Sequence, residues 1–445
     1  MTALGKSKYY APEIETMDRA GLENLQLERL KWQVHRCYEN SDFYRERFDR
    51  IGLKPDDIKS LDDVVKIPPV HKEELREEQK NHPPLGRYTV APQRDWEELH
   101  PSTGTTGVPV NTVWSRRDVE NITQWTARVL WSSGVRPGDI AQNGFAYGLW
   151  VAGLSVHYAA KAIGCFVLPI GASMTDRHVD YFLNPGATVL IATPSFAFYI
   201  SERMKERGIS SGDIPLRIGS FGGEGGIEAP STRERIESRL GIDAYDIFGL
   251  AEIGPTCAAE CEAKAGLHFV EDHLLIETID PKTMKRCKPG EVGVLVMTHL
   301  TKEATPMLRY WTNDNARLTT EKCACGRTHV RCVGGILGRA DDLIIYKGEN
   351  FYPSQVEKVI KSFNELNDEF RIRLTTDEKT GMDVVTVVAE CAIESVNTDK
   401  VRNKLRQALR DELLVTPTLE LVKPGTLERA MFKAKRVEDN REKAS

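Results

Sequence analysis

Hydrophobic residues near the start of the chain recur at the spacing of a helix. Between residues 22 and 46, Leu27, Leu30, Val34 and Cys37 follow one another at steps of three or four positions. Residues at this spacing lie on one face of a helix. The pattern therefore predicts one amphipathic helix over this range, packed against the rest of the protein.

Short hydrophobic runs with the length of strands fill the middle of the chain. The segments AKAIGCFVLPIG, GATVLIAT and IPLRIGSFGGEGG each combine such a run with a glycine or proline turn. Helical patterns separate these runs. The alternation predicts an α/β fold in which loops at the strand ends carry the chemistry.

The pattern changes near Gly338. The segment GRADDLIIYKGENFYPSQVEKVI predicts a strand, a glycine turn and a helix, MDVVTVVAEC predicts a further strand, and Val401 and Leu405 begin another helical repeat. We therefore predict a large α/β N-terminal domain over residues 1–338 and a small α+β C-terminal domain over residues 339–445. The last segment, RAMFKAKRVEDNREKAS, is weakly apolar and typical of a solvated tail.

Composition and charge narrow the class of protein. The 445 residues are 40% hydrophobic and 28% charged, which suits two or three folded domains, and the net charge of −5 gives no basic excess for binding nucleic acid. The N-terminus lacks the apolar core of a signal peptide, and no apolar run approaches the ~20 residues of a membrane span. We expect a cytoplasmic protein with no nucleic-acid or membrane partner.

A loop rich in glycine and hydroxyl residues, HPSTGTTGVPV, is a candidate phosphate site. Glycines allow backbone amides to close on an anion, and hydroxyls add donors. The loop is not a Walker A motif, because Val108 follows Gly107 where that motif has lysine. By itself such a composition more often belongs to an ordinary loop than to a phosphate site. The candidate residues are Ser102, Thr103, Gly104, Thr105, Thr106 and Gly107.

Several motifs in order along the chain point to one family. STGTTG resembles the phosphate loop of the adenylate-forming enzymes, which include acyl- and aryl-CoA synthetases, adenylation domains and luciferases. YDIFGLAE is similar to the aromatic-Gly-x-x-Glu motif of that superfamily, YWTND to its ribose-binding motif and GRADDLIIYKGENFYPSQVE to its hinge segment. LQLERLKWQV, YENSDFYRERF and LTKEATPMLRYWT resemble the phenylacetate-CoA ligase subfamily in particular.

The resemblance implies an ATP-dependent aryl-acid CoA ligase. Such an enzyme forms an acyl-adenylate and pyrophosphate, and then an acyl-CoA thioester and AMP. Its substrates and cofactors would be a small aromatic carboxylic acid, ATP, Mg²⁺ and coenzyme A, and relatives are often homodimers. Two alternatives stay open: a synthetase of the same subfamily that adenylates coenzyme F420, and a catalytically silent nucleotide-binding protein.

The resemblance also assigns roles to residues of the nucleotide site. Glu252 would hold Mg²⁺, Asp314 would accept hydrogen bonds from the ribose hydroxyls, and Arg339 would contact ribose or phosphate. Phe248 stands where the subfamily commonly has tyrosine, so the aromatic face is kept without the hydroxyl. The adenine slot would be formed by Gly222, Gly223, Glu224, Tyr245, Asp246, Phe248 and Gly249.

Two positions in the C-terminal part are implied to act in the conformational cycle. Asp341, with Asp342 as the alternative, matches the hinge about which the small domain moves. Lys433 matches the lysine that reaches into the closed site during adenylation, and Lys435 is its alternative.

The acyl pocket is implied by aromatic residues that surround Gly148. In the subfamily this stretch lines the pocket for the substrate ring, although aromatic residues at such spacing also pack in cores. Lys72 matches a lysine near the substrate, and it is equally typical of an exposed helix rich in glutamate. The substrate-binding candidates are Phe145, Tyr147, Trp150 and Lys72.

Six of the nine cysteines lie between residues 257 and 332, and four Cys and His residues have the spacing of a metal site. Cys261 and His268 form C-x6-H, and Cys323 and Cys325 form C-x-C. Three thiolates and one imidazole are the ligands of a closed tetrahedral zinc site. The segments ECEAKAGLH and CACGRTH resemble those of relatives that use such a site structurally. Cys257 or Cys332 could replace one ligand, and buried cysteines without metal are the alternative.

Overall fold

An 11-stranded sheet forms the centre of the molecule, with strand order β10-β11-β12-β13-β9-β8-β7-β6-β5-β3-β4. The computed structural model describes residues 7–102, 108–340, 344–346, 349–376, 383–394, 398–428 and 436–440. The strands of this sheet are β3 (Ile140–Asn143), β4 (Phe166–Leu168), β5 (Val189–Ala192), β6 (Ile218–Phe221), β7 (Asp243–Leu250), β8 (Gly254–Ala259), β9 (Leu267–Phe269), β10 (Leu274–Ile279), β11 (Val292–His299), β12 (Tyr310–Thr319) and β13 (Arg331–Cys332).

The sheet changes from parallel to antiparallel at β7. Strands β3 to β7 pair in parallel, so their carboxyl ends lie at one edge, whereas β7 and the strands beyond it pair antiparallel. In open α/β sheets this edge is where ligands bind. The predicted strands in AKAIGCFVLPIG, GATVLIAT and IPLRIGSFGGEGG are β4, β5 and β6.

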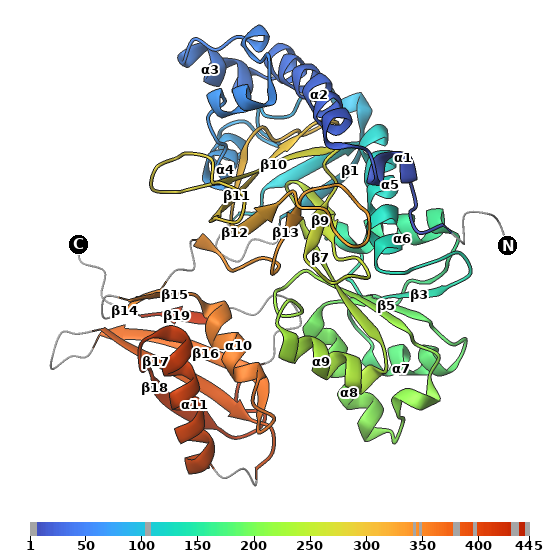
Figure 1. Cartoon of the computed structure of the whole chain (residues 1–445), viewed down its shortest axis with the longest axis vertical. Coiled ribbons are helices and arrows are strands. Elements are labelled where there is room, and N and C mark those ends of the chain that lie inside the picture. Colours follow the sequence, from blue (N-terminus) through green and yellow to red (C-terminus); the bar gives the residue numbers. More distant parts are fainter. Residues whose placement is uncertain are drawn as a thin grey trace.

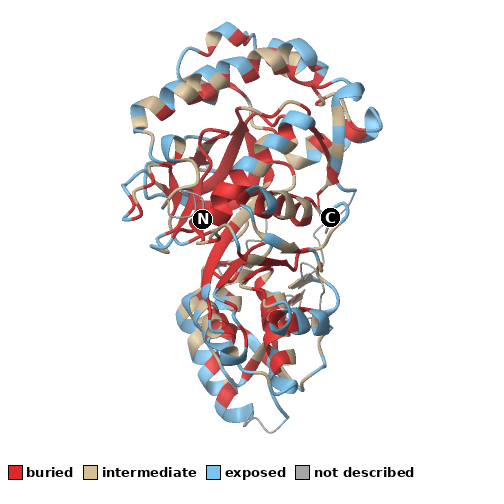
Figure 2. Cartoon of the chain, turned by 90° about the vertical axis from the view of Figure 1, so that its right-hand side faces the viewer, coloured by how far each residue is buried: buried red, intermediate tan, exposed pale blue. Residues whose placement is uncertain are grey.

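Helices cover the sheet and bury its apolar side chains. Buried residues gather on the central strands and on the inner sides of the helices around them (Figure 2). No helix in the described part of the chain has the length and apolar character needed to cross a membrane. The helices before residue 340 are α1 (Pro12–Glu15), α2 (Arg19–Asn40), α3 (Asp42–Arg50), α4 (Lys72–Asn81), α5 (Arg116–Ser132), α6 (Val151–Ile163), α7 (Thr175–Leu183), α8 (Pro194–Glu206) and α9 (Pro230–Leu240).

The prediction of one unbroken helix over residues 22–46 is wrong, because the chain breaks at Ser41 into α2 and α3. Ser41 has extended backbone angles, and its hydroxyl accepts the amide of Tyr44 and donates to the carbonyl of Arg87 at 2.7 Å. Serine in this position caps a new helix. The hydrophobic spacing continues through the break and hides it.

The C-terminal residues build a second sheet with its own hydrophobic cluster. Strands β14 (Ile344–Tyr346) and β15 (Glu349–Phe351) form a hairpin, and β16 (Leu366–Thr376), β17 (Asp383–Cys391), β18 (Thr418–Val422) and β19 (Val437–Asp439) form a four-stranded sheet in the order β18-β17-β16-β19. Helices α10 (Pro353–Lys361) and α11 (Thr398–Leu413) contact each other beside it. Figure 1 shows this unit beside α9, with α10 facing that helix.

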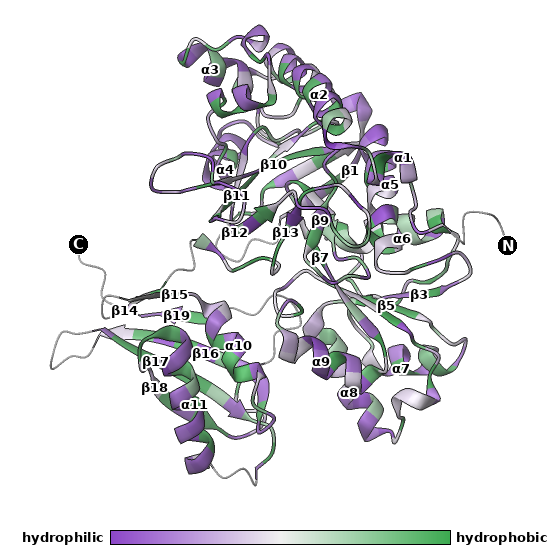
Figure 3. Ribbon diagram, in the orientation of Figure 1, coloured by the Kyte–Doolittle hydropathy of each residue, from purple (hydrophilic) through white to green (hydrophobic). Residues whose placement is uncertain are grey.

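The final segment differs in part from the solvated tail that its pattern predicts. Val437 to Asp439 form β19, which pairs in parallel with β16, far away in the sequence. Three residues with one apolar side chain are too few for a periodic pattern, so the sequence carries no signal for this strand. Hydrophobic residues colour parts of many strands, whereas β13 and much of the visible side of α2 are hydrophilic (Figure 3).

Candidate active site

The candidate phosphate loop connects two paired strands. Strands β1 (Trp96–Pro101) and β2 (Asn111–Ser115) pair antiparallel, and Ser102 directly follows β1. The Ser102 amide donates to the Val110 carbonyl at 2.7 Å, and its hydroxyl accepts the Val110 amide at 3.0 Å. Ser102 therefore fixes the base of the loop. The other candidates, Thr103, Gly104, Thr105, Thr106 and Gly107, lie outside the described residues.

A buried carboxylate lies next to this hairpin. Glu252 is in the turn between β7 and β8 and is 4% exposed. Its Oε1 is 2.8 Å from the Nζ of Lys72, the first residue of α4. The Thr112 hydroxyl on β2 lies 3.3 Å from the carbonyl of Ala251. Glu252, Lys72 and the hairpin are thus held together at the edge where the parallel strands end.

Tyr310 links Glu252 to the candidate ribose site. Burial and the Glu252 carboxylate raise the pKa of Tyr310 well above its ordinary value, and the Asp314 carboxylate adds to this effect. Asp314, on β12, is buried, and its Oδ1 lies 3.6 Å from the Nη1 of Arg339. The backbones of these two residues also form a β-bridge. The sequence candidates Glu252, Asp314 and Arg339 therefore share one neighbourhood.

The loop after β6 approaches the backbone of β7 very closely. A Cβ atom on Gly222 would lie 2.2 Å from the Ile247 carbonyl oxygen, so only glycine fits there. Gly223 has a φ of +87°. The Glu224 carboxylate accepts a hydrogen bond of 2.6 Å from the amide of Ser195, which lies in the first turn of α8. This loop lies at the same edge of the sheet as Glu252.

Asp246 is buried and faces a half-buried acid, Glu228, that the motifs did not single out. Burial and the neighbouring carboxylates of Glu228 and Glu260 raise the pKa of Asp246 well above its ordinary value. Gly335 lies between the two acids: a Cβ on it would be 2.7 Å from the Glu228 Cβ and 3.4 Å from the Asp246 Oδ2. Both carboxyl groups therefore lie beside the loop after β6 (Gly222–Gly226), the candidate adenine loop.

The other adenine candidates on β7 divide between the faces of the strand, because neighbouring strand residues point in opposite directions. The Tyr245 ring lies 5.1 Å from the Nζ of Lys264 and burial raises its pKa to about 12, whereas Phe248 packs edge-on against Phe269. A Cβ on Gly249 would lie 2.1 Å from the backbone of Pro255. Contact of these side chains with adenine stays a prediction.

Two of the three aromatic candidates for the acyl pocket contact each other. The rings of Phe145 and Trp150 meet edge-on with centroids 5.1 Å apart, and the Trp150 ring lies against Gly223. Tyr147 turns instead toward α6, where its hydroxyl lies 3.1 Å from the Nδ1 of His157. The loop after β3 therefore brings an aromatic pair onto the candidate adenine loop.

Positions assigned to the conformational cycle fall outside the part of the chain that the structure describes. These are Asp341, Asp342, Lys433 and Lys435.

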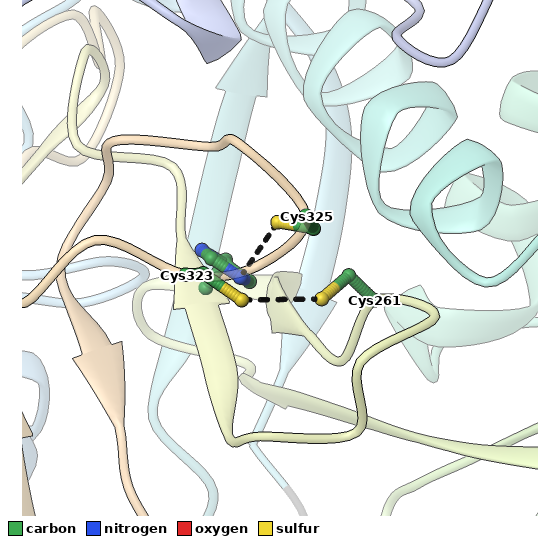
Figure 4. Close-up of side chains that lie close together, drawn as sticks. Cys261, Cys323 and Cys325 are labelled. Carbon is green, nitrogen blue, oxygen red and sulfur yellow. Dashed lines mark hydrogen bonds between the residues drawn. The ribbon is translucent and has the colours of Figure 1, made fainter.

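The Cys/His cluster (Cys261, His268, Cys323 and Cys325) comes together from two distant segments. All four residues are buried, and their ligand atoms lie within 4.8 Å of one another. Figure 4 shows the sulfur atoms of the three cysteines directed toward a common point. The sulfur atoms of Cys261 and Cys323 are 3.8 Å apart, and the Cys325 sulfur is 3.5 Å from the His268 Nε2.

These separations fit a tetrahedral zinc ion. Zn–S distances of about 2.3 Å and Zn–N distances of about 2.0–2.1 Å place two sulfurs about 3.8 Å apart, and a sulfur and a nitrogen about 3.6 Å apart. The Cys261 thiol and His268 lower the pKa of Cys325, which favours the thiolate that a metal needs. Cys332 instead donates to the Gly335 carbonyl, and Cys257 is buried in the main core.

A buried arginine lies beside the Cys/His cluster. The Arg327 amide donates to the Cys325 sulfur at 3.4 Å, and its side-chain Nε is 2.7 Å from Glu15 Oε2. Tyr9 also donates to the Cys325 carbonyl at 2.9 Å. Three thiolates and Zn²⁺ carry a net charge of −1, which a guanidinium can offset. The cluster therefore lies under the N-terminal segment and holds it to the chain near residue 325.

Sequence motifs identified the charged residues with familiar spacings but missed Glu228 and the role of Tyr310. Glu228 follows the GGEGG loop without a motif of its own, and its contact with Asp246 depends on the meeting of two loops. Tyr310 belongs to the YWTND segment, in which Asp314 drew the functional interpretation.

Comparisons with known proteins place the chain among characterised relatives. The family model for the AMP-binding enzyme C-terminal domain matches residues 348–441. A phenylacetate-coenzyme A ligase from Thermus thermophilus is 38% identical over 438 residues, which cover 95% of this chain and 97% of that protein. A phenylacetate-coenzyme A ligase from Pseudomonas putida is 35% identical over 435 residues, 96% of each chain.

Solved structures of a CoA ligase are similar to nearly the whole chain and represent two states of that enzyme. A 2-hydroxyisobutyryl-CoA ligase in its postadenylation state, in complex with R3-HIB-AMP, is 30% identical, has a TM-score of 0.92 and covers 99% of this chain and 94% of its own. The same ligase in its thioesterification state is 31% identical with the same coverage, but its TM-score is 0.75. The described orientation of the C-terminal unit is thus the one seen in the postadenylation state. By these identities over nearly its whole length, the chain belongs to the phenylacetate-coenzyme A ligase family of adenylate-forming enzymes.

Proposed function

We propose that this chain is an AMP-forming ligase that joins a small aromatic carboxylic acid to coenzyme A at the expense of ATP. The observation that carries the proposal is the grouping of Glu252, Asp314 and Arg339 around Tyr310, beside the Ser102 hairpin. This constellation belongs to a chain that is 38% identical to a phenylacetate-coenzyme A ligase over 95% of its length.

In the first half-reaction the substrate carboxylate attacks the α-phosphate of ATP, forms an acyl-adenylate and releases pyrophosphate. Glu252 offers the carboxylate oxygen that Mg²⁺ prefers, and the ion would neutralise the phosphates when bound. The Asp314 carboxylate accepts hydrogen bonds from the ribose hydroxyls, and Arg339 adds a positive charge nearby. Catalysis here consists mainly of positioning and charge stabilisation.

In the second half-reaction the thiol of coenzyme A attacks the activated carbonyl and displaces AMP. The division into residues 1–338 and 339–445 supplies the moving part, with Asp341 as the hinge and Lys433 withdrawn from the site. Support comes from the separate hydrophobic cluster of the C-terminal unit and from the two states described for the related 2-hydroxyisobutyryl-CoA ligase.

The aromatic character of the acid is supported by Phe145 and Trp150, whose rings meet beside Gly223. Aromatic rings pack favourably in such edge-on arrangements. Lys72 lies close enough to Glu252 to face the carboxylate end of the substrate. Phenylacetate is the first candidate, because the relatives named above are phenylacetate-coenzyme A ligases.

The Cys/His cluster holds a structural zinc ion in this proposal. The cluster offers four buried ligands at the spacing of a tetrahedron. Four protein ligands fill the coordination sphere of zinc and leave no open position for substrate. The ion would bind the loop after β8 and His268 on β9 to the loop before β13, next to the pairs that β9 forms with β8 and β13. A homodimeric state and a cytoplasmic location stay predictions.

The testing experiment measures AMP formation from Mg-ATP and coenzyme A across a panel of acids. Phenylacetate, benzoate, hydroxy- and aminobenzoates and indoleacetate form the panel, with 2-hydroxyisobutyrate as an aliphatic comparison. We expect coenzyme A-dependent AMP formation with one or a few aromatic acids. Pyrophosphate release from ATP that requires added coenzyme F420 and forms no thioester would replace the proposal by the F420-adenylating function. ATP binding without turnover of any acid would identify a silent binding protein.

A further inference from the structure

A lysine from the C-terminal unit is buried against the candidate adenine loop. Lys361, the last residue of α10, has a side chain that is 7% exposed, and its Nζ is 2.7 Å from Glu357 Oε1. The same Nζ lies 2.6 Å from the point where a Cβ on Gly226 would be. Gly226 has a φ of +127°, so it is glycine that lets the ammonium reach the loop backbone.

Two acids lie near this ammonium: Glu224 within the loop and Glu228 two residues after its end. Burial raises the pKa values of Glu224 and Glu228, while the Lys361 charge acts on both in the opposite direction. Burial also disfavours the charge of Lys361, but the carboxylates of Glu357, Asp368 and Glu224 outweigh it and raise its pKa. Glu224, Glu357, Lys361 and Asp368 line a common cavity, together with Arg436, which pairs with Glu369 inside the C-terminal unit.

A second contact holds the two parts in this arrangement. Arg235, on α9, donates from Nη1 to Asp368 Oδ1 at 2.9 Å and to the Lys361 carbonyl at 3.1 Å. Carbonyls in the last turn of a helix lack partners within the helix, so the guanidinium satisfies one of them at the end of α10. Arg235 thereby fixes the place from which Lys361 reaches the loop.

We propose that Lys361 is a positioning residue for the first half-reaction. By neutralising Glu224 it holds the Gly222–Gly226 loop in the form that receives adenine, and it does so in the orientation shared with the postadenylation state. ATP binding and docking of the C-terminal unit therefore favour each other. The inference rests on the proposed function in one respect, because the adenine-binding role of the loop is part of that proposal.

The test compares Lys361→Met with Lys358→Met. Lys358 lies one turn earlier on α10, is 56% exposed and pairs with Glu412 on α11 inside the same unit. For Lys361→Met we expect the KM for ATP in pyrophosphate release, and the Kd for ATP in equilibrium dialysis, to rise about tenfold. Thioester formation from preformed acyl-adenylate should keep its wild-type rate, and Lys358→Met should match wild type in all three assays.

A second substitution separates a charge effect from a folding defect. Glu224→Gln keeps an oxygen that can accept the Ser195 amide and removes the charge that needs Lys361. Added to Lys361→Met, it should restore most of the ATP affinity, and Lys361→Arg should restore part of it. Unchanged ATP affinity in Lys361→Met, an equal loss in both half-reactions, or no recovery with Glu224→Gln would overturn the inference.

Wild-type activity in the same assays keeps the two proposals apart. If wild type binds ATP but adenylates no acid, the proposed function fails, while the dialysis comparison of Lys361→Met and Lys358→Met still decides the role of Lys361.

Discussion

In the Cys/His cluster, four donor atoms from two segments lie within 4.8 Å of one another, and all four residues are buried. The charged residues at the strand ends come from several elements, and two of the acids have a cationic neighbour: Lys72 lies beside Glu252, and Arg339 beside Asp314. One ion would complete the first region. The second consists of ion pairs whose partners can be exchanged for those of a substrate.

This difference shows how one chain separates stability from turnover. A closed set of four ligands binds an ion that need not leave, so its free energy of binding adds to the stability of the fold. Buried ion pairs contribute little net stability, because desolvation opposes the attraction, but they keep charges ready at defined positions. Substitutions in the two regions should therefore differ in which quantity they change.

Cys323→Ser should have the largest effect on stability. Loss of one thiolate ligand should abolish stoichiometric zinc binding and cost at least about 4 kcal/mol of unfolding free energy. Metal analysis of the purified protein and thermal denaturation measure both quantities. Cys287→Ser is the matched control, since Cys287 is only half-buried and lies outside the cluster. A Cys323→Ser protein with full zinc content and wild-type melting would refute the metal site.

Glu252→Gln should have the largest effect on turnover. Removal of the carboxylate that would hold Mg²⁺ should lower the kcat of pyrophosphate release by about 10²- to 10³-fold. The melting temperature should stay close to wild type, because glutamine has nearly the same shape. Glu73→Gln, on the exposed side of α4, serves as the control and should be fully active. Wild-type turnover in Glu252→Gln would show that the metal is held elsewhere.

Asp314→Asn should act on ATP binding. Hydrogen bonds to a charged group contribute about 1.5–3 kcal/mol. The KM for ATP should therefore rise about 10- to 100-fold, with a smaller change in kcat, in steady-state assays of pyrophosphate release. Asp280→Asn, in an exposed turn, is the control. A change in kcat alone would contradict the ribose assignment.

Lys72→Met should affect stability less than Cys323→Ser does, and it should sharpen the comparison. Glu252 would lose its described ion-pair partner, at a cost of about 1–2 kcal/mol because a quarter of the Lys72 side chain is exposed. Thermal denaturation measures this cost, and the double variant with Glu252→Gln should recover it. If the two single effects simply add, the ion pair does not couple the residues.

Local signals in the sequence were sufficient for much of this molecule. The four-residue run of β5 is fully apolar and that of β6 is apolar except for Ser220, as expected for buried strands covered on both faces. Cysteine and histidine are rare enough that C-x6-H and C-x-C identified the cluster, although its two halves are 55 residues apart between His268 and Cys323. Motifs likewise identified Glu252 and Asp314.

The features that the sequence did not reveal depend on contacts between distant segments. Ser41 divides α2 from α3 through capping, without a change in hydrophobic spacing. β19 exists because β16 offers it an edge. Lys361 resembles any basic residue at the end of a helix until the C-terminal unit is placed against Gly226, and Glu228 gains its meaning from Asp246.

The most direct test of the ligase assignment follows the products of one turnover with and without coenzyme A. Wild-type protein is mixed with Mg-ATP and the preferred aromatic acid, and pyrophosphate, acyl-adenylate and AMP are quantified over time. The account predicts one equivalent of pyrophosphate and enzyme-bound acyl-adenylate without coenzyme A, and AMP with thioester only after coenzyme A is added. Release of ADP and phosphate, or AMP formation that is the same with and without coenzyme A, would contradict it.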